Sequence, residues 1–234
     1  MRKIVLASGS ERRRDLLGWL ELDFEVIESG FDESVVGDCE VEELVTTLAF
    51  EKAMKVVREG LDEEGGVVVG ADTIVVIEEQ GDSSADSASS LQANSLREIS
   101  GQGEEVLGKP KDEQAAIKML KRLSGRKHEV LTGVAVVDSD SGEKLVEVEK
   151  TTVEFRSLSD KEIEEYVLSG EPMGKAGSYA IQGGAGKFLA GLEGSFTNVV
   201  GLPLVRLVGM LEEMGIVVEV SVEEVVYSMT GFRS

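Results

Sequence analysis

The most hydrophobic stretch of the chain, residues 66–77, is interrupted only by Gly70, Asp72 and Thr73. Its length and its many β-branched residues predict a central strand of a sheet. An acid in the middle of such a strand is costly to bury unless it is paired or holds a metal. Asp72 is therefore the strongest single candidate for a catalytic residue. The alternative is that Asp72 lies at a strand end and caps a neighbouring turn.

Strands and helices alternate along the chain, without internal repeats. Strands are predicted over residues 3–7, 23–28, 66–77, 128–137, 144–155 and 216–220, and helices over residues 10–20, 41–59, 111–123, 159–168 and 203–214. The strands 128–137 and 144–155 are separated by a polar turn, which predicts a hairpin. Ser159 and Glu162 form a capping-box pattern at the start of their helix. The fold class is α/β or mixed α+β, built on a twisted sheet.

Two segments lack a regular pattern. Between residues 79 and 105 the composition changes to Ser, Asp, Gln, Gly and Ala with few large apolar side chains. This composition predicts a flexible surface insertion rather than an element of the fold. Residues 174–201 are glycine-rich and are predicted to be irregular.

Charge and composition exclude several classes of function. The formal net charge of -21 argues against a nucleic-acid-binding surface, which needs many Lys and Arg contacts to phosphates. No apolar run approaches the roughly 20 residues that a membrane-spanning helix needs, so no membrane association is expected. Cys39 and His128 are the only cysteine and histidine, which excludes a disulfide framework, a zinc site and a Ser or Cys triad. A reducing, cytoplasmic location is the natural expectation.

The loop from Ser8 to Arg14 joins a strand end to a helix N-terminus that carries three consecutive arginines. Helix N-termini attract phosphate, and guanidinium groups add charge-assisted contacts that are often bidentate. Basic side chains are unfavourable at this end of a helix, so three of them in an acidic protein indicate an anionic partner. The alternative is an ordinary, solvated first turn.

Other charged residues could complete a phosphate site. Magnesium prefers carboxylate oxygens together with substrate phosphates, so Glu33 and Asp72 could place a metal ion and a water beside a triphosphate. Lys52 lies on the inner part of its predicted helix, where its long stem could reach a cleft; a solvated helix lysine is the alternative. Lys109 is held between Gly108 and Pro110 in a predicted turn.

The glycine-rich segment 174–186 has neither Walker spacing nor a dinucleotide fingerprint. Tyr179 could stack on a nucleotide base and Gln182 could hydrogen-bond to it, while the glycines would allow the backbone to approach closely. A flexible hinge is the alternative.

Taken in order, these motifs resemble the Maf family of nucleotide pyrophosphatases, first named for inhibition of septum formation. The resemblance covers nearly the whole chain apart from the predicted insertion. Its motifs are Leu6 to Arg13, Asp32-Glu33, Glu51 to Ala53, Gly70 to Thr73, Gly108 to Pro110, Ser124 to Arg126, Thr132 to Val134, Gly177 to Gly183 and Asn198 to Pro203. Ordered motifs over this length are highly specific.

The resemblance implies an inosine-triphosphatase-like α/β fold, in which residues 1–234 form a single domain. Its long, twisted mixed sheet is flanked by helices, and two lobes enclose a central cleft. The resemblance further implies cleavage between the α and β phosphates of non-standard or pyrimidine nucleotides. A divalent cation, Mg²⁺, Mn²⁺ or Co²⁺, would be the cofactor, and a homodimer is implied as well.

The same resemblance assigns roles to individual residues. The phosphate-binding residues would be Ser8, Arg12, Arg13, Lys52 and Lys109, and the metal ligands would be Glu33 and Asp72. Asp72 would activate the attacking water, and Lys52 and Lys109 would take part in catalysis by neutralising charge. Gln182, within Ala180 to Gly183, resembles the dTTP and UTP branch of the family.

One residue of the phosphate loop departs from the family pattern, because Glu11 stands where a proline is usual. Glu11 brings negative charge close to the expected phosphates, although it favours the helix dipole and could pair with an arginine. Two other functions are weighed against dTTP and UTP hydrolysis. They are a pyrophosphatase for 7-methyl-GTP or another modified nucleotide, and a nucleotide-binding regulator of cell division with little catalysis.

Overall fold

A computed structural model describes residues 2–33, 39–62, 65–78, 96–98 and 104–232, with the backbone alone for 96–98. The chain divides into two compact units. Unit 1 comprises Met1–Thr73, Leu131–Thr151 and Glu193–Ser234, and unit 2 comprises Ile74–Val130 and Thr152–Leu192.

The strands of the described residues form one mixed sheet of eight strands. They are β1 (Ile4–Leu6), β2 (Phe24–Val26), β3 (Val67–Glu78), β4 (Leu96–Glu98), β5 (Glu104–Leu107), β6 (Lys127–Asp138), β7 (Lys144–Phe155) and β8 (Leu189–Glu193). The order is β2-β1-β3-β6-β7-β8, with β5 paired to β3 and β4 paired to β5. β1 runs parallel to β2 and β3, whereas β5 runs antiparallel to β3 and β4. The predicted mixed α/β class is confirmed.

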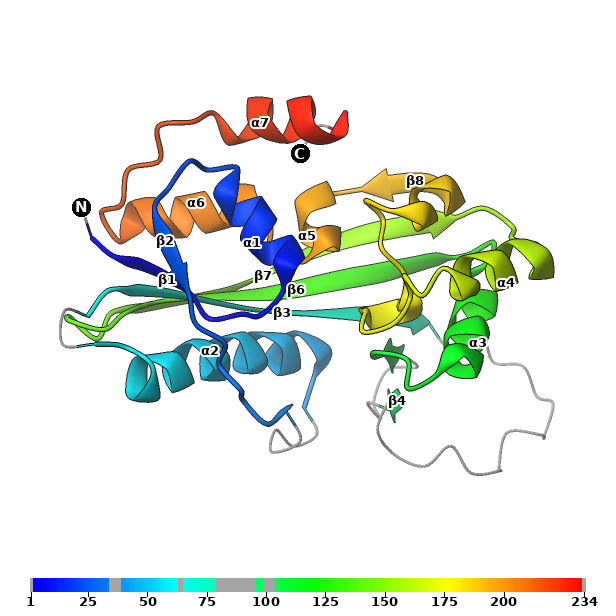
Figure 1. The fold of residues 1–234 in the computed structure, drawn as a ribbon, viewed down its shortest axis with the longest axis horizontal. Helices are drawn as coiled ribbons and strands as arrows, with labels where there is room; N and C mark the ends of the chain where they lie inside the picture. Colours follow the sequence, from blue (N-terminus) through cyan, green and yellow to red (C-terminus); the bar gives the residue numbers. More distant parts are fainter. Residues whose placement is uncertain (1, 34–38, 63–64, 79–95, 99–103, 233–234) are drawn as a thin grey trace. The chain divides into compact units, whose positions relative to one another are not determined.

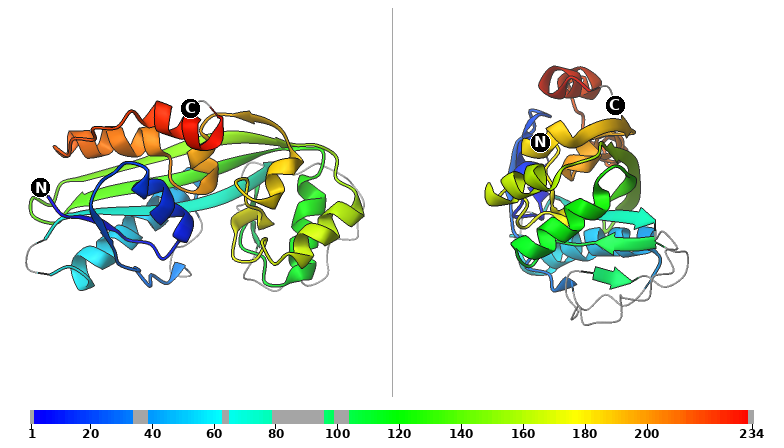
Figure 2. Two further views of the ribbon diagram at one scale, coloured as in Figure 1. Left: turned by 45° about the horizontal axis from the view of Figure 1, so that its top comes forward. Right: turned by 90° about the vertical axis from the view of Figure 1, so that its right-hand side faces the viewer.

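In unit 1, helices cover both faces of the sheet. α2 (Val41–Glu59) lies on one face, and α1 (Glu11–Gly18) and α6 (Leu204–Glu213) lie on the other (Figures 1 and 2). The predicted helices 10–20, 41–59 and 203–214 are confirmed, with Pro203 at the N-cap of α6. The hairpin is confirmed too, because Asp138 N donates to Glu143 O at 2.9 Å where β6 turns into β7.

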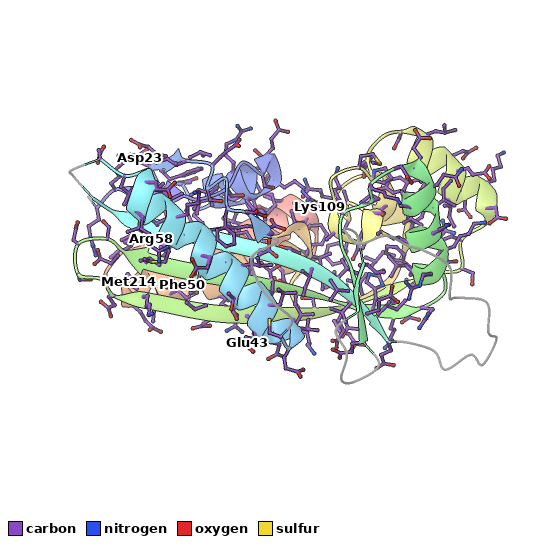
Figure 3. All side chains as sticks on the ribbon, turned by 90° about the horizontal axis from the view of Figure 1, so that it is seen from below. Asp23, Glu43, Phe50, Arg58, Lys109 and Met214 are labelled. Atoms are coloured by element: carbon purple, nitrogen blue, oxygen red, sulfur yellow. The ribbon has the colours of Figure 1, made fainter. Side chains whose placement is uncertain are left out.

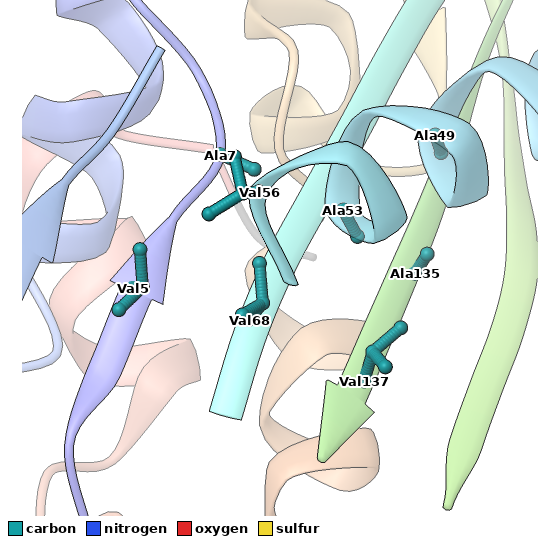
Figure 4. Close-up of a cluster of buried hydrophobic side chains, with 8 residues drawn as sticks. All are labelled: Val5, Ala7, Ala49, Ala53, Val56, Val68, Ala135 and Val137. Atoms are coloured by element: carbon teal, nitrogen blue, oxygen red, sulfur yellow. The ribbon is translucent and has the colours of Figure 1, made fainter. Parts of the chain in front are cut away.

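Small residues allow α2 to approach the sheet closely. A core cluster of Val5, Ala7, Ala49, Ala53, Val56, Val68, Ala135 and Val137 fills this interface (Figure 4). A Cβ atom on Gly70 would lie 2.3 Å from the carbonyl oxygen of Ala49, and one on Gly133 would lie 2.3 Å from that of Val45. The α2 backbone therefore rests directly on β3 and β6, and only glycine fits at these two positions.

Unit 2 contains α3 (Glu113–Leu123) and α4 (Asp160–Leu168), which contact each other. The predicted helices 111–123 and 159–168 are confirmed. The capping box is present, since the Ser159 side chain accepts from Glu162 N while the Glu162 carboxylate accepts from Ser159 N. An N-cap that was not predicted opens α3, where Asp112 accepts from Ala115 N at 2.7 Å.

The predicted strand 216–220 is wrong. No described strand pairs with it, and Val217 is 76% exposed, so the β-branched run has no sheet edge to join. It is followed instead by a helix that was not predicted, α7 (Val222–Thr230). Ser221 caps α7 by accepting from Glu224 N, so the pattern Ser-x-x-Glu was a readable signal for its start.

Two segments contain more structure than predicted. β4 lies within residues 79–105 and β5 overlaps the end of this segment. The prediction that the segment adds no element to the fold is therefore wrong at these two strands. Residues 79–95 and 99–103 lie outside the described residues. The glycine-rich segment 174–201 contains the 3₁₀ helices η2 (Ala176–Ser178) and η3 (Gly184–Phe188), β8, and the short helix α5 (Phe196–Val200). Among the described helices, none is both long enough and apolar enough to cross a membrane.

Candidate functional site

Three of the predicted site residues meet around one ammonium group. Lys52 Nζ lies 2.6 Å from Asp72 Oδ1 and 2.7 Å from Glu33 Oε1. Asp72 is 8% exposed and Lys52 is 9% exposed, whereas the Glu33 side chain is 44% exposed. The structural alternatives fail here, because Asp72 caps no turn and Lys52 is not a solvated helix lysine. The three side chains form a partly open acid and ammonium cluster.

The packing of α2 explains why these residues meet. Lys52 lies next to Ala53, which contacts the backbone of β3 at Gly70, two residues before Asp72. Close contact at these small residues brings the helix near enough for Lys52 to reach the strand. Neutralising the buried carboxylate with an ammonium then offsets the cost of removing both charges from water.

Arg13 is fixed by three hydrogen bonds. Its Nε donates to the carbonyl oxygen of Gly201 at 2.8 Å, its Nη2 donates to Thr73 Oγ1 at 3.0 Å, and its Nη1 lies 3.4 Å from Ser8 Oγ. A guanidinium has five N–H groups, so one on each Nη atom has no partner among the described residues. A pair of N–H groups of this kind matches the bidentate geometry that phosphate favours.

The electrostatic surroundings of Arg13 link it to the acid cluster. Burial lowers the pKa of Arg13 from its ordinary value, while the negative charges of Asp72 and Glu33 act in the opposite direction. An arginine remains protonated in either case. An anionic ligand would stabilise this half-buried, permanent positive charge, because it would replace the water that the guanidinium has lost.

The acid cluster and Arg13 both contact β3 beyond the point where its pairing with β1 ends. The β1–β3 pairing ends with Leu6 opposite Val69, and Ser8 follows two residues after Leu6. Asp72 and Thr73 come after this pairing ends. Successive side chains of a strand point to opposite faces, and accordingly Asp72 contacts α2 while Thr73 contacts Arg13 of α1. Past the end of β1, groups from both faces of the sheet can reach one ligand.

The remaining residues of the loop differ in exposure. Ser8 is buried at 8% exposure, and its Oγ accepts from Ser10 N at 3.2 Å. Arg12 is half-buried, whereas Arg14 is exposed, as an ordinary first turn would have it. Glu11 is exposed and forms no ion pair within the described part of the chain, so the suggestion that it pairs with an arginine is wrong.

Lys109 and Gln182 belong to unit 2. Lys109 is exposed in the loop between β5 and α3 (Figure 3), and Gln182 is exposed between η2 and η3. Both side chains are exposed, and their roles stay predictions.

Tyr179 is not available to a base. It is 5% exposed, its ring packs edge-on against His128 and Phe155, and its hydroxyl lies 2.9 Å from His128 Nε2. The suggestion that Tyr179 stacks on a nucleotide is therefore wrong, because the ring belongs to the core of unit 2. His128 is structural, as expected, and burial lowers its pKa to about 3.

Sequence reasoning missed two of the groups that hold Arg13. Thr73 lies within one of the family motifs, but the sequence assigned it no role. The carbonyl of Gly201 is a backbone group, which no residue type reveals. Gly201 has a φ of +126°, which favours glycine, and it directly follows α5. A glycine before Leu202-Pro203 was the only readable signal.

The family model and the curated relatives agree with each other. A family model described as Maf-like protein matches residues 3–214. A curated protein of Pelotomaculum thermopropionicum named dTTP/UTP pyrophosphatase is 46% identical over 92% of this chain and 98% of its own length. One of the same name from Ruminiclostridium cellulolyticum is 41% identical over 92% of this chain and 97% of its own length. Among solved structures, the Staphylococcus aureus Ham1 protein matches at 16% identity and a TM-score of 0.35, covering 66% of this chain and 72% of that one.

Proposed function

The chain belongs to the Maf family, and we propose that it hydrolyses a nucleoside triphosphate, dTTP or UTP, to the monophosphate and pyrophosphate. The observation that supports this proposal best is the cluster of Glu33, Lys52 and Asp72 beside a fixed Arg13. Relatives named dTTP/UTP pyrophosphatase match almost their full length, which supports the choice of substrate.

Phosphate binding would rest on positive groups that the fold has already placed. The N–H groups of Arg13 that lack a partner among the described residues would bind phosphate oxygens, together with backbone amides at the start of α1. Lys52 has a third N–H beyond its two carboxylate contacts and would neutralise a further phosphate oxygen. Arg12, Lys109 and Gln182 are assigned to phosphates and base on the family resemblance.

Asp72 would act on the attacking water. Its Oδ1 accepts from Lys52, while its Oδ2 has no hydrogen-bond partner among the residues that the structure describes. This oxygen can therefore accept a proton from a water aligned with the α phosphorus. Attack there breaks the bond to the bridging oxygen between the α and β phosphates, and pyrophosphate leaves.

The donor set fits a divalent cation. Glu33 and Asp72 each give one carboxylate oxygen to Lys52 Nζ, so the two acids converge, and a cation beside the ammonium would be held by further lone pairs of the same two carboxylates. No group of three or more His, Cys, Asp or Glu side chains suited to a metal occurs in the described part of the chain. Magnesium commonly takes one or two carboxylates and completes its shell with water and phosphate oxygens, which this pair allows. Such an ion would neutralise phosphate charge and lower the pKa of its water.

The test is a pyrophosphate-release assay on the purified protein. The panel contains dTTP, UTP, the other canonical triphosphates and 7-methyl-GTP, each with Mg²⁺, Mn²⁺, Co²⁺ or a chelator. We expect dTTP and UTP to be cleaved fastest and the chelator to abolish release. Fastest cleavage of 7-methyl-GTP would instead indicate a pyrophosphatase for that modified nucleotide. If well-folded protein released no pyrophosphate from any triphosphate of the panel, a nucleotide-binding regulator would be favoured.

A labelling experiment tests the site of attack. In heavy-oxygen water the label enters whichever phosphorus the water attacks. We expect it in the monophosphate. Label in pyrophosphate instead would show attack on the β phosphorus and would contradict the mechanism.

A further inference from the structure

Arg13 donates to the first of two linked threonine hydroxyl groups, of which Thr73 is half-buried and Thr132 is buried. Its Nη2 donates to Thr73 Oγ1 at 3.0 Å, and Thr73 Oγ1 lies 2.9 Å from Thr132 Oγ1. The Thr132 hydroxyl donates to the carbonyl oxygen of Asn198 at 3.0 Å. Thr132 lies in β6 and is 0% exposed, so it cannot touch a substrate. The proposed function gives it no role.

The direction of every hydrogen bond in this chain is determined. A carbonyl oxygen only accepts, so the single hydroxyl hydrogen of Thr132 is committed to Asn198. Thr132 Oγ1 must then accept from the Thr73 hydroxyl, because Thr132 has no other hydrogen to donate. The oxygen of Thr73 is thereby presented to Arg13 as an acceptor. A guanidinium cannot accept, so the opposite direction is impossible.

The chain closes into a ring through α5. Asn198 belongs to α5, and Gly201, the residue that follows this helix, accepts from Arg13 Nε at 2.8 Å. A Cβ atom on Gly201 would lie 3.4 Å from Thr73 Oγ1 and 3.5 Å from Arg13 Nε. Thr132 and Arg13 thus both donate to carbonyls of α5 and of the residue that follows it. The guanidinium is bound on one side by the Gly201 carbonyl and on the other by Thr73, whose hydroxyl is linked through Thr132 to the same peptide segment.

We propose that Thr132 is a positioning residue for Arg13. Its hydroxyl orients Thr73 and anchors α5, and together these two effects hold the guanidinium plane in one orientation. The part of this inference that concerns phosphate rests on the proposed function, because a preorganised donor pair contributes most when it needs no rearrangement on binding.

The first test observes Arg13 in the substrate-free, full-length protein. Its Nε–H signal in a heteronuclear NMR spectrum is identified by its loss in Arg13→Lys. In Thr132→Val, which keeps the shape but removes the hydroxyl, we expect this proton to exchange with water about tenfold faster or more. Thr132→Ser keeps the hydroxyl and should restore the wild-type signal.

A control separates loss of a threonine hydroxyl from loss of this chain. Thr46 on α2 donates to carbonyls of its own helix, Glu42 O at 2.7 Å and Glu43 O at 3.1 Å, and Thr46→Val should leave the Arg13 signal unchanged. If Thr132→Val does not fold, Thr73→Val interrupts the same chain at a half-buried position. A wild-type Arg13 signal in folded Thr132→Val or in folded Thr73→Val overturns the proposal.

The second test is kinetic. We expect Thr132→Val to raise KM for the best triphosphate about tenfold while kcat changes less, since a contact to phosphate is weakened and the water-activating carboxylate is not. An unchanged KM would overturn the link to phosphate. If wild-type protein releases no pyrophosphate from any triphosphate, the proposed function fails, and the NMR signal alone decides whether Thr132 positions Arg13.

Discussion

Asp72 is buried, paired with Lys52 through one oxygen, and placed on β3 just past the end of its pairing with β1. Replacing its carboxylate with an amide keeps the shape and removes the ability to take a proton. We expect Asp72→Asn to lower kcat by about 100-fold or more, with a smaller change in nucleotide binding. Steady-state kinetics and calorimetric binding measure the two effects separately.

The matched control is Asp62→Asn in the same unit. Asp62 is an exposed partner of Lys3, and its substitution should leave kcat near the wild-type value. Near-normal turnover in Asp72→Asn would show that another group activates the water.

His128 links stability to pH. Burial lowers its pKa to about 3, from about 6.5 in an unfolded chain. Between these values only the unfolded chain binds the proton, so the contribution of neutral His128 is fully present above about pH 6.5 and is lost as the pH falls towards about 3. For one such group, the free energy of unfolding should fall by about 2 kcal/mol between about pH 7 and pH 5.

His128→Gln isolates this effect from the titration of carboxylates. Denaturant unfolding at several pH values should give a shallower decline for the variant over the same pH range. Parallel curves for the two proteins would show that His128 is protonated in the folded state as readily as in the unfolded one.

At the scale of elements, α2 depends on glycine in two strands. A methyl group on Gly70 would meet the Ala49 carbonyl oxygen at 2.3 Å and would displace the helix from β3. We expect Gly70→Ala to lower the free energy of unfolding by about 1–3 kcal/mol, through overpacking. Because Lys52 is positioned by the same contact, activity should fall as well. Denaturant unfolding and kinetics of the same sample provide both readouts.

Gly209 supplies the opposite case. It lies inside α6, where a Cβ atom would have no neighbour within 4 Å. Gly209→Ala should stabilise the protein by about 0.4–1 kcal/mol, because it restricts the unfolded chain without a clash. If both variants changed stability in the same direction, close packing at Gly70 would not be the cause.

At the scale of the whole molecule, charge is the dominant property. A formal net charge of -21 makes the folded state repel itself when counterions are scarce. The Debye length falls from about 30 Å at 0.01 M salt to about 3 Å at 1 M. We expect the midpoint of thermal unfolding to rise over this range in NaCl. An unchanged midpoint in salt would contradict this account.

Much of the fold could be predicted from local patterns. The periodicity of 41–59 and the capping box at Ser159 were sufficient for α2 and α4, because both signals involve residues within a few positions of each other. The strand predicted for residues 216–220 was wrong because a strand also depends on distant residues. Its β-branched residues favour a strand, but only a free sheet edge can make one, and the local pattern carries no information on that edge.

The candidate site divides in the same way. The sequence by itself singled out Asp72 as an acid within an apolar run, Lys52 on the inner part of its helix, and three arginines at a helix N-terminus; the family resemblance then singled out Arg13. Only the tertiary structure decided which of them meet. Lys52 reaches Asp72 because Gly70 lets α2 touch β3, and Arg13 is fixed by a carbonyl 188 residues away. Such contacts depend on packing between distant segments, which no local pattern records.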